Sequence, residues 1–288
     1  MLIIKDISHL KLYLKAYRDK GHSIGYVPTM GALHQGHAKL IKQSRDHNQK
    51  TVISTFVNEK QFNKKEDFNN YPRNKGKDYD FCDLHNVDVI FEPSSEEIYP
   101  DNKSKLINTY FQNILCDQFR PGHFDGVITV LNKLFSIIEV NKVYFGEKDF
   151  QQLKIVEKFI EEKFPNLQLV PVSTERHEEG IAYSSRNENL SKKQLQEFIN
   201  FHNSVVQFTK SFDRQTQIKE ANTLAKNFIT NLVDQEFDYF EFRNANSLEI
   251  EGKISEARLF YAIYKGQTRL IDNMKPDGGS ARIRTLNS

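Results

Sequence analysis

The chain has 288 residues, of which 38% are hydrophobic and 27% are charged, and its mean hydropathy is −0.61. This composition predicts a soluble globular protein of one large or two ordinary domains, and it excludes collagen-like, disordered and small disulfide-framework proteins. No stretch approaches the roughly 18 apolar residues of a membrane span, so membrane insertion is excluded as well.

Three basic side chains and one acidic side chain in residues 274–288 account for the whole formal net charge of +2. The rest of the chain lacks the basic bias of most nucleic-acid-binding proteins, so we expect no nucleic-acid partner. Residues 274–288 also lack periodicity, which predicts a mobile tail. Cys82 and Cys116 have no companion cysteine or ordered histidine spacing, so we interpret them as buried apolar residues. With no apolar leader behind Met1, they predict a reducing, cytoplasmic location.

The N-terminal half alternates short β-branched or aromatic runs with longer amphipathic stretches, a pattern typical of βαβ units. We therefore predict a Rossmann-like α/β domain with a parallel sheet. Apolar residues recur at helical spacing over 37–47 and 151–164, which predicts two helices. The five predicted strands are 23–27, 51–57, 87–91, 142–145 and 168–172.

The composition changes beyond Glu175, where 191–232 is helical and polar and 238–242 and 258–264 have the character of strands. This pattern predicts a second, smaller α+β domain. The expected organisation is a nucleotide- and substrate-binding domain over 1–174, a lid domain over 175–273 and a tail over 274–288.

Gly25 to His37, with the sequence GYVPTMGALHQGH, predicts a strand that leads through a glycine-bearing turn into a helix. At the carboxyl end of a parallel strand, helix-start amides favour anions, and Gly31 and Gly36 let a phosphate approach the backbone. His34 and His37 would then face one phosphate chain and stabilise the oxygens that gain charge when pyrophosphate leaves. The alternatives are surface positions or metal ligation, although a hydrolytic zinc site would need a third ligand and a His-Glu-x-x-His glutamate.

Residues 144–152, with the sequence YFGEKDFQQ, repeat this topology of strand, glycine and helix start. Lys148 is suited to a phosphate, Asp149 to Mg²⁺ or a ribose hydroxyl, and Gln152 to a polar substrate. The alternative interpretation is a capped helix with solvated charges. Ser184-Ser185-Arg186 offers two hydroxyls and a guanidinium, but such loop triplets are most often only solvated.

Two further segments have a structural interpretation that we favour. Arg120 to Gly126 contains a proline-glycine turn that would open a helix at Val127, and the alternative is a loop that closes the substrate pocket and contacts a dimer partner. Tyr71-Pro-Arg73 is interpreted as a solvated turn.

Taken together, these segments resemble the pantothenate synthetase (pantoate–beta-alanine ligase) family, which belongs to the HxGH-bearing nucleotidyltransferase superfamily. The resemblance covers nearly the entire chain. It rests on Tyr26-Val-Pro-Thr-Met-Gly-Ala-Leu-His-Gln-Gly-His37, Phe56-Val-Asn58, Gln61-Phe62, Asp67-Phe68, Tyr71-Pro-Arg73, Arg120-Pro-Gly-His-Phe-Asp-Gly126, Phe145-Gly-Glu-Lys-Asp-Phe-Gln-Gln152, Ser184-Ser-Arg-Asn187 and Arg269-Leu-Ile-Asp-Asn273.

The resemblance implies a two-step ligation in a cytoplasmic homodimer. ATP and pantoate would give an enzyme-bound pantoyl adenylate and pyrophosphate, and the beta-alanine amine would then displace AMP to give pantothenate. Mg²⁺ would accompany the ATP. Such a reaction needs positioning, charge neutralisation and exclusion of water rather than a covalent protein intermediate.

By position, the resemblance also implies the site residues. His37 takes the role of a proton donor, and the other residues with a catalytic role are His34, Lys148, Ser184, Ser185 and Arg186. Gln61 and Gln152 bind pantoate, Gln61 also binds beta-alanine, and Asp149 lies near the ribose and the metal. The residues that line the ATP site are Met30, Gly31, His34, Gly36, His37, Gly146, Glu147, Lys148, Asp149, Glu175, Tyr183, Ser184, Ser185 and Arg186.

The chain departs from the family pattern beside three of these positions. Glu59-Lys60 stands where the family has Pro-Thr, which removes a stiffening proline. Glu175 replaces a small apolar residue, and Tyr183 replaces a Leu or Met and adds a ring beside the adenine. Two rival functions stay open: an adenylyltransferase that acts on another carboxylate, and a catalytically silent nucleotide-binding module.

Overall fold

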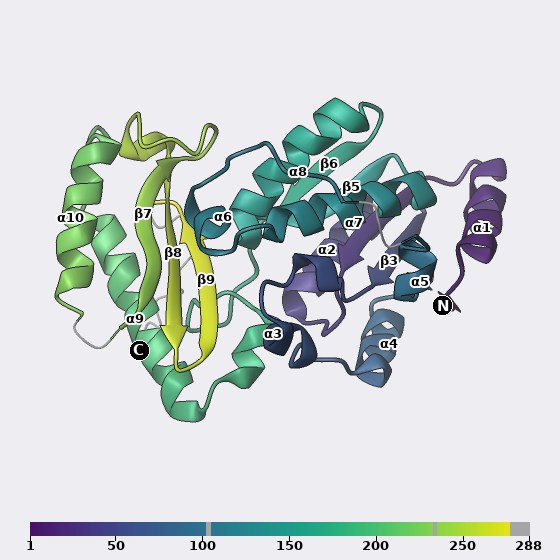
Figure 1. The fold of residues 1–288 in the computed structure, drawn as a ribbon, viewed down its shortest axis with the longest axis horizontal. Helices are drawn as coiled ribbons and strands as arrows, with labels where there is room; N and C mark the ends of the chain where they lie inside the picture. The colour runs from purple at the N-terminus through teal and green to yellow at the C-terminus, as the bar shows by residue number, and fades with distance from the viewer. Residues whose placement is uncertain (102–104, 233–234, 277–288) are drawn as a thin grey trace, which may run out of the picture. The chain divides into compact units, whose positions relative to one another are not determined.

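The computed structural model describes residues 1–101, 105–232 and 235–276, and the chain divides into two compact units, Met1–Glu175 and Arg176–Ser288. Figure 1 draws the helices and strands of both units as ribbons. The roles expected for the two domains, including that of a lid, stay predictions. Residues 277–288 of the expected mobile tail lie outside the described residues.

The first unit contains a parallel sheet in the strand order β1-β4-β3-β2-β5-β6. The Rossmann-like α/β prediction is confirmed, but five strands was wrong, because β1 adds a sixth. With three residues and an exposed Ile3 at the sheet edge, β1 has too little alternation to be recognised. The strands are β1 Leu2–Ile4, β2 Ile24–Thr29, β3 Lys50–Thr55, β4 Val89–Phe91, β5 Lys142–Gly146 and β6 Gln168–Val172.

Helices cover both faces of this sheet, because alternate strand residues point to opposite sides. Val27 and Ile53 pack with Ile41 of α2 on one face. On the other face, Tyr26 meets Phe135 of α7 edge to face, with ring centroids 6.4 Å apart. Counting the 3₁₀ segments η, the helical elements are α1 Ile7–Asp19, α2 Gln35–His47, η1 Glu59–Gln61, α3 Lys65–Asn69, α4 Lys75–Leu84, α5 Ser95–Ile98, α6 Leu115–Phe119, α7 His123–Ile138, η2 Glu147–Asp149 and α8 Phe150–Lys163.

Helix α7 begins at His123 and not at Val127, so the predicted start was four residues late. The proline-glycine turn does precede it, because Gly122 has the left-handed φ of 78° that a glycine adopts without strain. The predicted helices 37–47 and 151–164 are confirmed as α2 and α8. Cys82 and Cys116 are buried free thiols, as interpreted.

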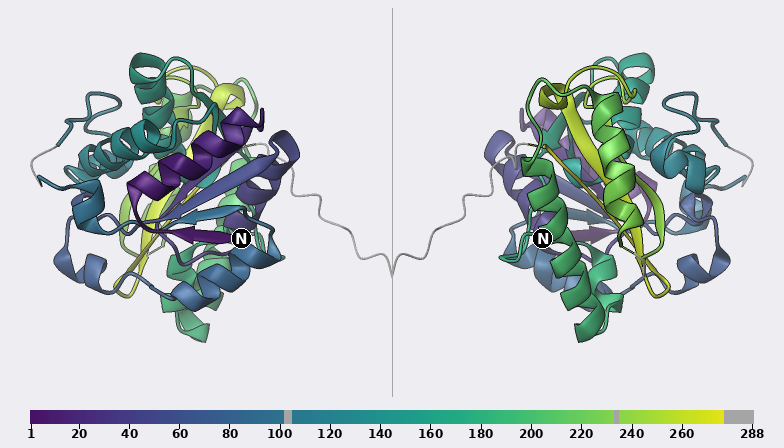
Figure 2. Two further views of the ribbon diagram at one scale, coloured as in Figure 1. Left: turned by 90° about the vertical axis from the view of Figure 1, so that its right-hand side faces the viewer. Right: turned by 90° about the vertical axis from the view of Figure 1, so that its left-hand side faces the viewer.

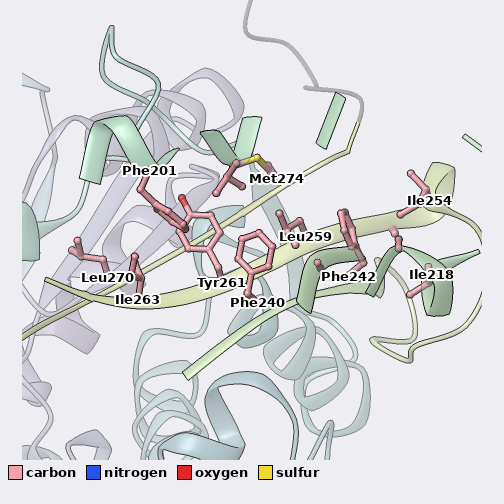
Figure 3. Packing of buried hydrophobic residues seen from close by; sticks show 14 of the residues in the cluster. Phe201, Ile218, Phe240, Phe242, Ile254, Leu259, Tyr261, Ile263, Leu270 and Met274 are labelled. Atoms are coloured by element: carbon pink, nitrogen blue, oxygen red, sulfur yellow. The ribbon is translucent and has the colours of Figure 1, made fainter. Parts of the chain in front are cut away.

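The second unit packs α9 and α10 against one face of an antiparallel sheet, β7-β8-β9 (Figure 2, right). Figure 3 shows its apolar core, in which Phe201 of α9 meets Tyr261 of β8 with ring planes at 90°. The α+β prediction is confirmed. The elements are η3 Ser185–Asn189, α9 Lys192–Lys210, α10 Ile218–Thr230, β7 Phe237–Asn244, η4 Ile254–Glu256, β8 Ala257–Lys265 and β9 Thr268–Met274.

Strand β9 was not predicted from the sequence. Two of its buried residues, Asp272 and Asn273, are polar, so the strand lacks the alternation of apolar and polar residues that would identify it. Its last residue is the buried Met274, so the tail expected from residue 274 onward began too early. Across 1–101, 105–232 and 235–276, no helix combines the length and the apolar character needed to span a membrane.

Candidate active site

The functional segments of the first unit meet at a topological switch point of the sheet. Strand β2 pairs with β3 on one side and with β5 on the other, although β3 follows it directly in the chain and β5 comes much later. At such a point the two connections leave in opposite directions and open a crevice at the carboxyl ends of the strands. Residues 30–34, here called the β2–α2 loop, and η2 after β5 both begin at this edge.

Several amide groups of the β2–α2 loop and the start of α2 donate hydrogen bonds to acceptors within the protein. Anion binding by the backbone of this segment stays a prediction. The side chains of His34 and His37 are further donors that the segment offers to a phosphate. The amide bonds are Gly31 N to Thr29 Oγ1 (3.2 Å), Ala32 N to Asp78 Oδ2 (3.0 Å), Leu33 N to Asp78 Oδ1 (2.8 Å), His34 N to His37 Nδ1 (3.2 Å) and Gly36 N to His34 Nδ1 (3.2 Å).

The two imidazoles of His34 and His37 lie together, with ring centroids 4.1 Å apart. In each ring Nδ1 accepts a backbone N–H, so the neutral ring carries its proton on Nε2. Burial and the nearby charge of Lys148 lower the pKa of His37 from 6.5 to about 4. At neutral pH His37 is therefore a neutral hydrogen-bond donor and not an imidazolium.

The lowered pKa of His37 predicts that stability falls in mild acid. The unfolded chain takes up this proton near pH 6.5 and the folded chain only near pH 4. Protonation of His37 therefore leaves the free energy of unfolding unaffected above pH 6.5. As the pH falls toward 4, it lowers the free energy of unfolding by up to about 3 kcal/mol. Urea unfolding at pH 7 and pH 5 should show a smaller decrease for His37→Gln than for the wild type. An imidazole NMR titration with a midpoint near 6.5 for His37 would contradict the assignment.

Lys148 and Asp149 lie on η2, directly after β5. The Lys148 side chain is 18% exposed, and its Nζ lies 3.8 Å from Oδ1 of Asp149, whose side chain is 47% exposed. Because β2 and β5 are parallel neighbours in the sheet, the segments that follow them begin at the same edge. An added Cβ on Gly146, between β5 and η2, would meet nothing within 4 Å, so space is open beside the backbone there. Glu147 is half-buried on the same turn.

Gln61 is buried at the end of η1 and contacts the β2–α2 loop. Its Nε2 donates to the sulfur of Met30 at 2.9 Å, and its Oε1 accepts from Asn58 Nδ2 at 3.1 Å. Its backbone oxygen accepts from His123 Nδ1 at 2.7 Å and from Arg120 at 3.3 Å. The structure thus brings Gln61 to the loop that carries the histidines and reveals Arg120 and His123 as its supports. Sequence reasoning missed that support.

The remaining candidates of the first unit are Gln152 and Glu175. Gln152 is half-buried in the first turn of α8, next to Gln151, whose buried amide donates to the backbone oxygens of Phe111 and Ile114. Glu175 pairs with Lys39 of α2 at 2.9 Å. The acidic departure from the family pattern therefore has a partner in this chain.

The segment from Tyr183 to Arg186 belongs to the second unit. The Ser184 hydroxyl accepts the Arg186 amide at 3.3 Å and caps η3, which begins at Ser185. The Arg186 guanidinium donates to the backbone oxygen of Arg269 at 3.3 Å, and the Tyr183 ring stacks on His177 with centroids 3.7 Å apart. These contacts fix the local shape of the segment, and its nucleotide contacts stay predictions.

Asp149 is the metal ligand that the sequence pattern predicts. The described residues contain no group of three or more His, Cys, Asp or Glu side chains able to hold a metal ion. Asp149 offers one half-exposed carboxylate at the switch point. A single carboxylate beside substrate phosphates is a common way to bind Mg²⁺, so Asp149 fits a metal that arrives with a nucleotide.

Known proteins similar to this chain match it over almost its full length. The family model described as pantoate-beta-alanine ligase matches residues 2–275. A pantothenate synthetase from Aquifex aeolicus (strain VF5) is 41% identical over 280 residues, which cover 95% of this chain and 98% of the relative. One from Clostridium botulinum (strain Loch Maree / Type A3) is 40% identical with the same coverage.

Solved structures agree with these sequence relatives. The pantothenate synthetase of Thermus thermophilus superimposes with a TM-score of 0.86 at 30% identity, covering 96% of this chain and 99% of that one. The pantoate-beta-alanine ligase of Francisella tularensis, complexed with beta-gamma ATP and beta-alanine, has a TM-score of 0.81 at 32% identity and covers 96% and 98%.

Proposed function

Because the chain belongs to the pantoate–beta-alanine ligase family, we propose that the loops after β2 and β5 hold ATP while pantoate is adenylated. The enzyme is a ligase that joins pantoate and beta-alanine to pantothenate in an ATP-dependent reaction. The observation that supports this proposed mechanism is that His37, Lys148 and Gln61 converge on one edge of the sheet.

In the first step a carboxylate oxygen of pantoate forms a bond to the α-phosphorus of ATP, and the bond from that phosphorus to the pyrophosphate oxygen breaks. Negative charge grows on the departing pyrophosphate. The Nε2–H groups of His34 and His37 and the ammonium of Lys148 stabilise that charge as fixed donors. A neutral His37 suits this role, because the reaction needs a hydrogen bond to the leaving oxygens and no net proton transfer.

Gln61 and Gln152 hold the hydroxyl and carboxylate oxygens of pantoate, and Gln61 also contacts beta-alanine. In the second step the beta-alanine amine attacks the acyl carbon of the adenylate, the bond to the AMP oxygen breaks, and the amine loses a proton to solvent. Water exclusion protects the adenylate from hydrolysis between the steps.

Further parts of the proposal concern groups beyond this core. Met30, Gly31, Gly36 and the half-buried Gly146 and Glu147 line the nucleotide site, Glu175 lies near the adenine, and Tyr183, Ser184, Ser185 and Arg186 contact the nucleotide during the reaction. Asp149 would hold Mg²⁺ when it is bound, and the ion would neutralise phosphate charge. We also propose that the enzyme acts in the cytoplasm as a homodimer.

Gly126→Ala is expected to disturb Gln61 directly. An added Cβ at this position of α7 would lie 2.2 Å from the backbone oxygen of Lys60 and 2.6 Å from Cα of Gln61, so η1 must move. We expect a loss of about 1–3 kcal/mol of unfolding free energy and a raised KM for pantoate. The matched control is Gly76→Ala on α4, where the nearest atom lies 3.8 Å away and both quantities should stay near wild type. An unchanged KM in a stable Gly126→Ala protein would contradict the role of Gln61.

AMP release from ATP and Mg²⁺, with pantoate and beta-alanine supplied together, singly and not at all, tests the proposed sequence of steps. Release with both substrates, accompanied by pantothenate, and ATP–pyrophosphate exchange with pantoate alone are expected. Exchange that requires a different acid would identify an adenylyltransferase of another carboxylate. ATP binding without AMP release under any condition would identify a silent nucleotide-binding module.

A further inference from the structure

Asp78 is a buried carboxylate outside the β2–α2 loop that holds the backbone of the loop. It lies on α4 and is 6% exposed. Its Oδ2 accepts the amide of Ala32 at 3.0 Å, and its Oδ1 accepts the amide of Leu33 at 2.8 Å. Hydrogen bonds to a carboxylate are stronger than bonds between neutral groups, and two bonds to consecutive amides also fix an orientation.

The backbone at this point has a conformation that needs support. Gly31 has a φ of 79° and Ala32 a φ of 51°, so two consecutive residues are left-handed. Gly31 tolerates this conformation, but Ala32 is strained by its Cβ. Gly31 also leaves room for the carboxylate, because an added Cβ there would lie 2.9 Å from Asp78 Oδ2. The carboxylate therefore stabilises the strained conformation that precedes His34, the N-cap of α2.

The charge of Asp78 lies beside a loop assigned to a triphosphate, where an exposed carboxylate would repel the substrate. Both of its oxygens face amide donors, which balance part of that charge. Asp78 is not part of a group of metal ligands among the described residues. Its geometry is that of a support for the loop and not that of a ligand contact.

We infer that Asp78 is a positioning residue, which holds the β2–α2 loop in the conformation that aims Nε2–H of His34 and His37 at the ATP phosphates. The inference rests on the proposed function for its catalytic consequence. Without the carboxylate, the loop reaches other conformations, and the amides of Ala32 and Leu33 lose their acceptors. The two imidazoles then lose the shared geometry that suits a phosphate chain.

Asp78→Asn tests this role most directly, because the amide keeps the size of the side chain. One of the two carboxylate oxygens is replaced by an NH₂ group, which cannot accept the backbone N–H that it faces. We expect kcat/KM for ATP in pantoate-dependent exchange to fall about 10- to 100-fold. The ¹⁵N imidazole spectrum should change from the Nε2–H tautomer of His34 and His37 to a mixture. Asp80→Asn, an exposed position on the same helix, is the control and should match the wild type in both measurements.

Two outcomes for Asp78→Asn overturn the inference. One is lower stability with wild-type kcat/KM and tautomers in the folded protein, which would make Asp78 merely structural. The other is lost activity with unchanged tautomers, which would mean that the carboxylate acts on the ligand itself.

The wild-type protein supplies a test that needs no variant. The amide protons of Ala32 and Leu33 should exchange slowly in the ligand-free protein, and fast exchange of both would overturn the inference even if no variant folds. If the wild type shows no pantoate-dependent exchange, the proposed reaction fails. The tautomer spectra and amide exchange still decide whether Asp78 holds the loop.

Discussion

Replacing Lys148 with alanine is expected to lower kcat of pantoate-dependent ATP–pyrophosphate exchange by about 100- to 1,000-fold, the usual cost of removing one donor aimed at developing charge. The Lys148 side chain is only 18% exposed, and its charge lowers the pKa of His37, so it lies near the place where the pyrophosphate is proposed to leave. Lys148→Arg keeps the charge with a different shape and should recover part of the loss.

The control for this variant is Lys158→Ala on α8, which removes an exposed lysine paired with Glu161 at 2.7 Å and should leave exchange unchanged. The same Lys148→Ala protein provides a second measurement. Loss of the positive neighbour should raise the pKa of His37 above about 4, while burial still keeps it below 6.5. Exchange within about threefold of the wild type would refute the assigned role of Lys148.

Asp272→Asn is expected to be the most destabilising of the conservative variants, with a loss of about 3–5 kcal/mol of unfolding free energy. Asp272 is 3% exposed in β9 and forms two bonds to Arg176, at 2.6 and 3.0 Å. The guanidinium also donates to the backbone oxygens of Gly180 and Asn273. The amide variant therefore leaves the guanidinium of Arg176, whose side chain is only 25% exposed, without its carboxylate partner, and that penalty exceeds the loss of a single hydrogen bond.

Urea unfolding followed by circular dichroism measures this effect. Asp19→Asn is the matched control, because Asp19 pairs with Lys15 at 2.6 Å on the exposed face of α1 and should contribute less than about 1 kcal/mol. The double variant Arg176→Met/Asp272→Leu should recover much of the lost stability, since it removes both charges together. A loss for Asp272→Asn as small as that of the control would show that the buried pair contributes little.

The sequence predicted local features of the first unit well. Strand β2, the glycine-bearing turn and α2 were foreseen, because they follow from residues within one short segment. Lys148 begins at the same edge of the sheet as this segment, because parallel neighbouring strands present their carboxyl ends at one edge. Strand β1 could not be predicted, because its three residues are too few to show the alternation of a strand.

Long-range polar contacts could not be predicted from one sequence. Asp78 holds Ala32 across 46 positions, and Arg176 meets Asp272 across 96. Neither contact leaves a local pattern, because a carboxylate in a helix or a strand has the character of a solvated residue until burial is known. For the same reason, the sequence could not show that the amides of Ala32, Leu33 and His34 donate to acceptors within the protein.

Transfer of an isotopic label from pantoate to AMP tests the central claim most directly. Pantoate carrying ¹⁸O in its carboxylate is converted with ATP and beta-alanine, and the AMP, pyrophosphate and pantothenate are analysed by mass spectrometry. If the pantoate carboxylate attacks the α-phosphorus, each AMP acquires one ¹⁸O and the amide of pantothenate keeps the other. Unlabelled AMP, or label found in pyrophosphate or inorganic phosphate, would contradict the pantoyl adenylate and the roles proposed for His34, His37 and Lys148.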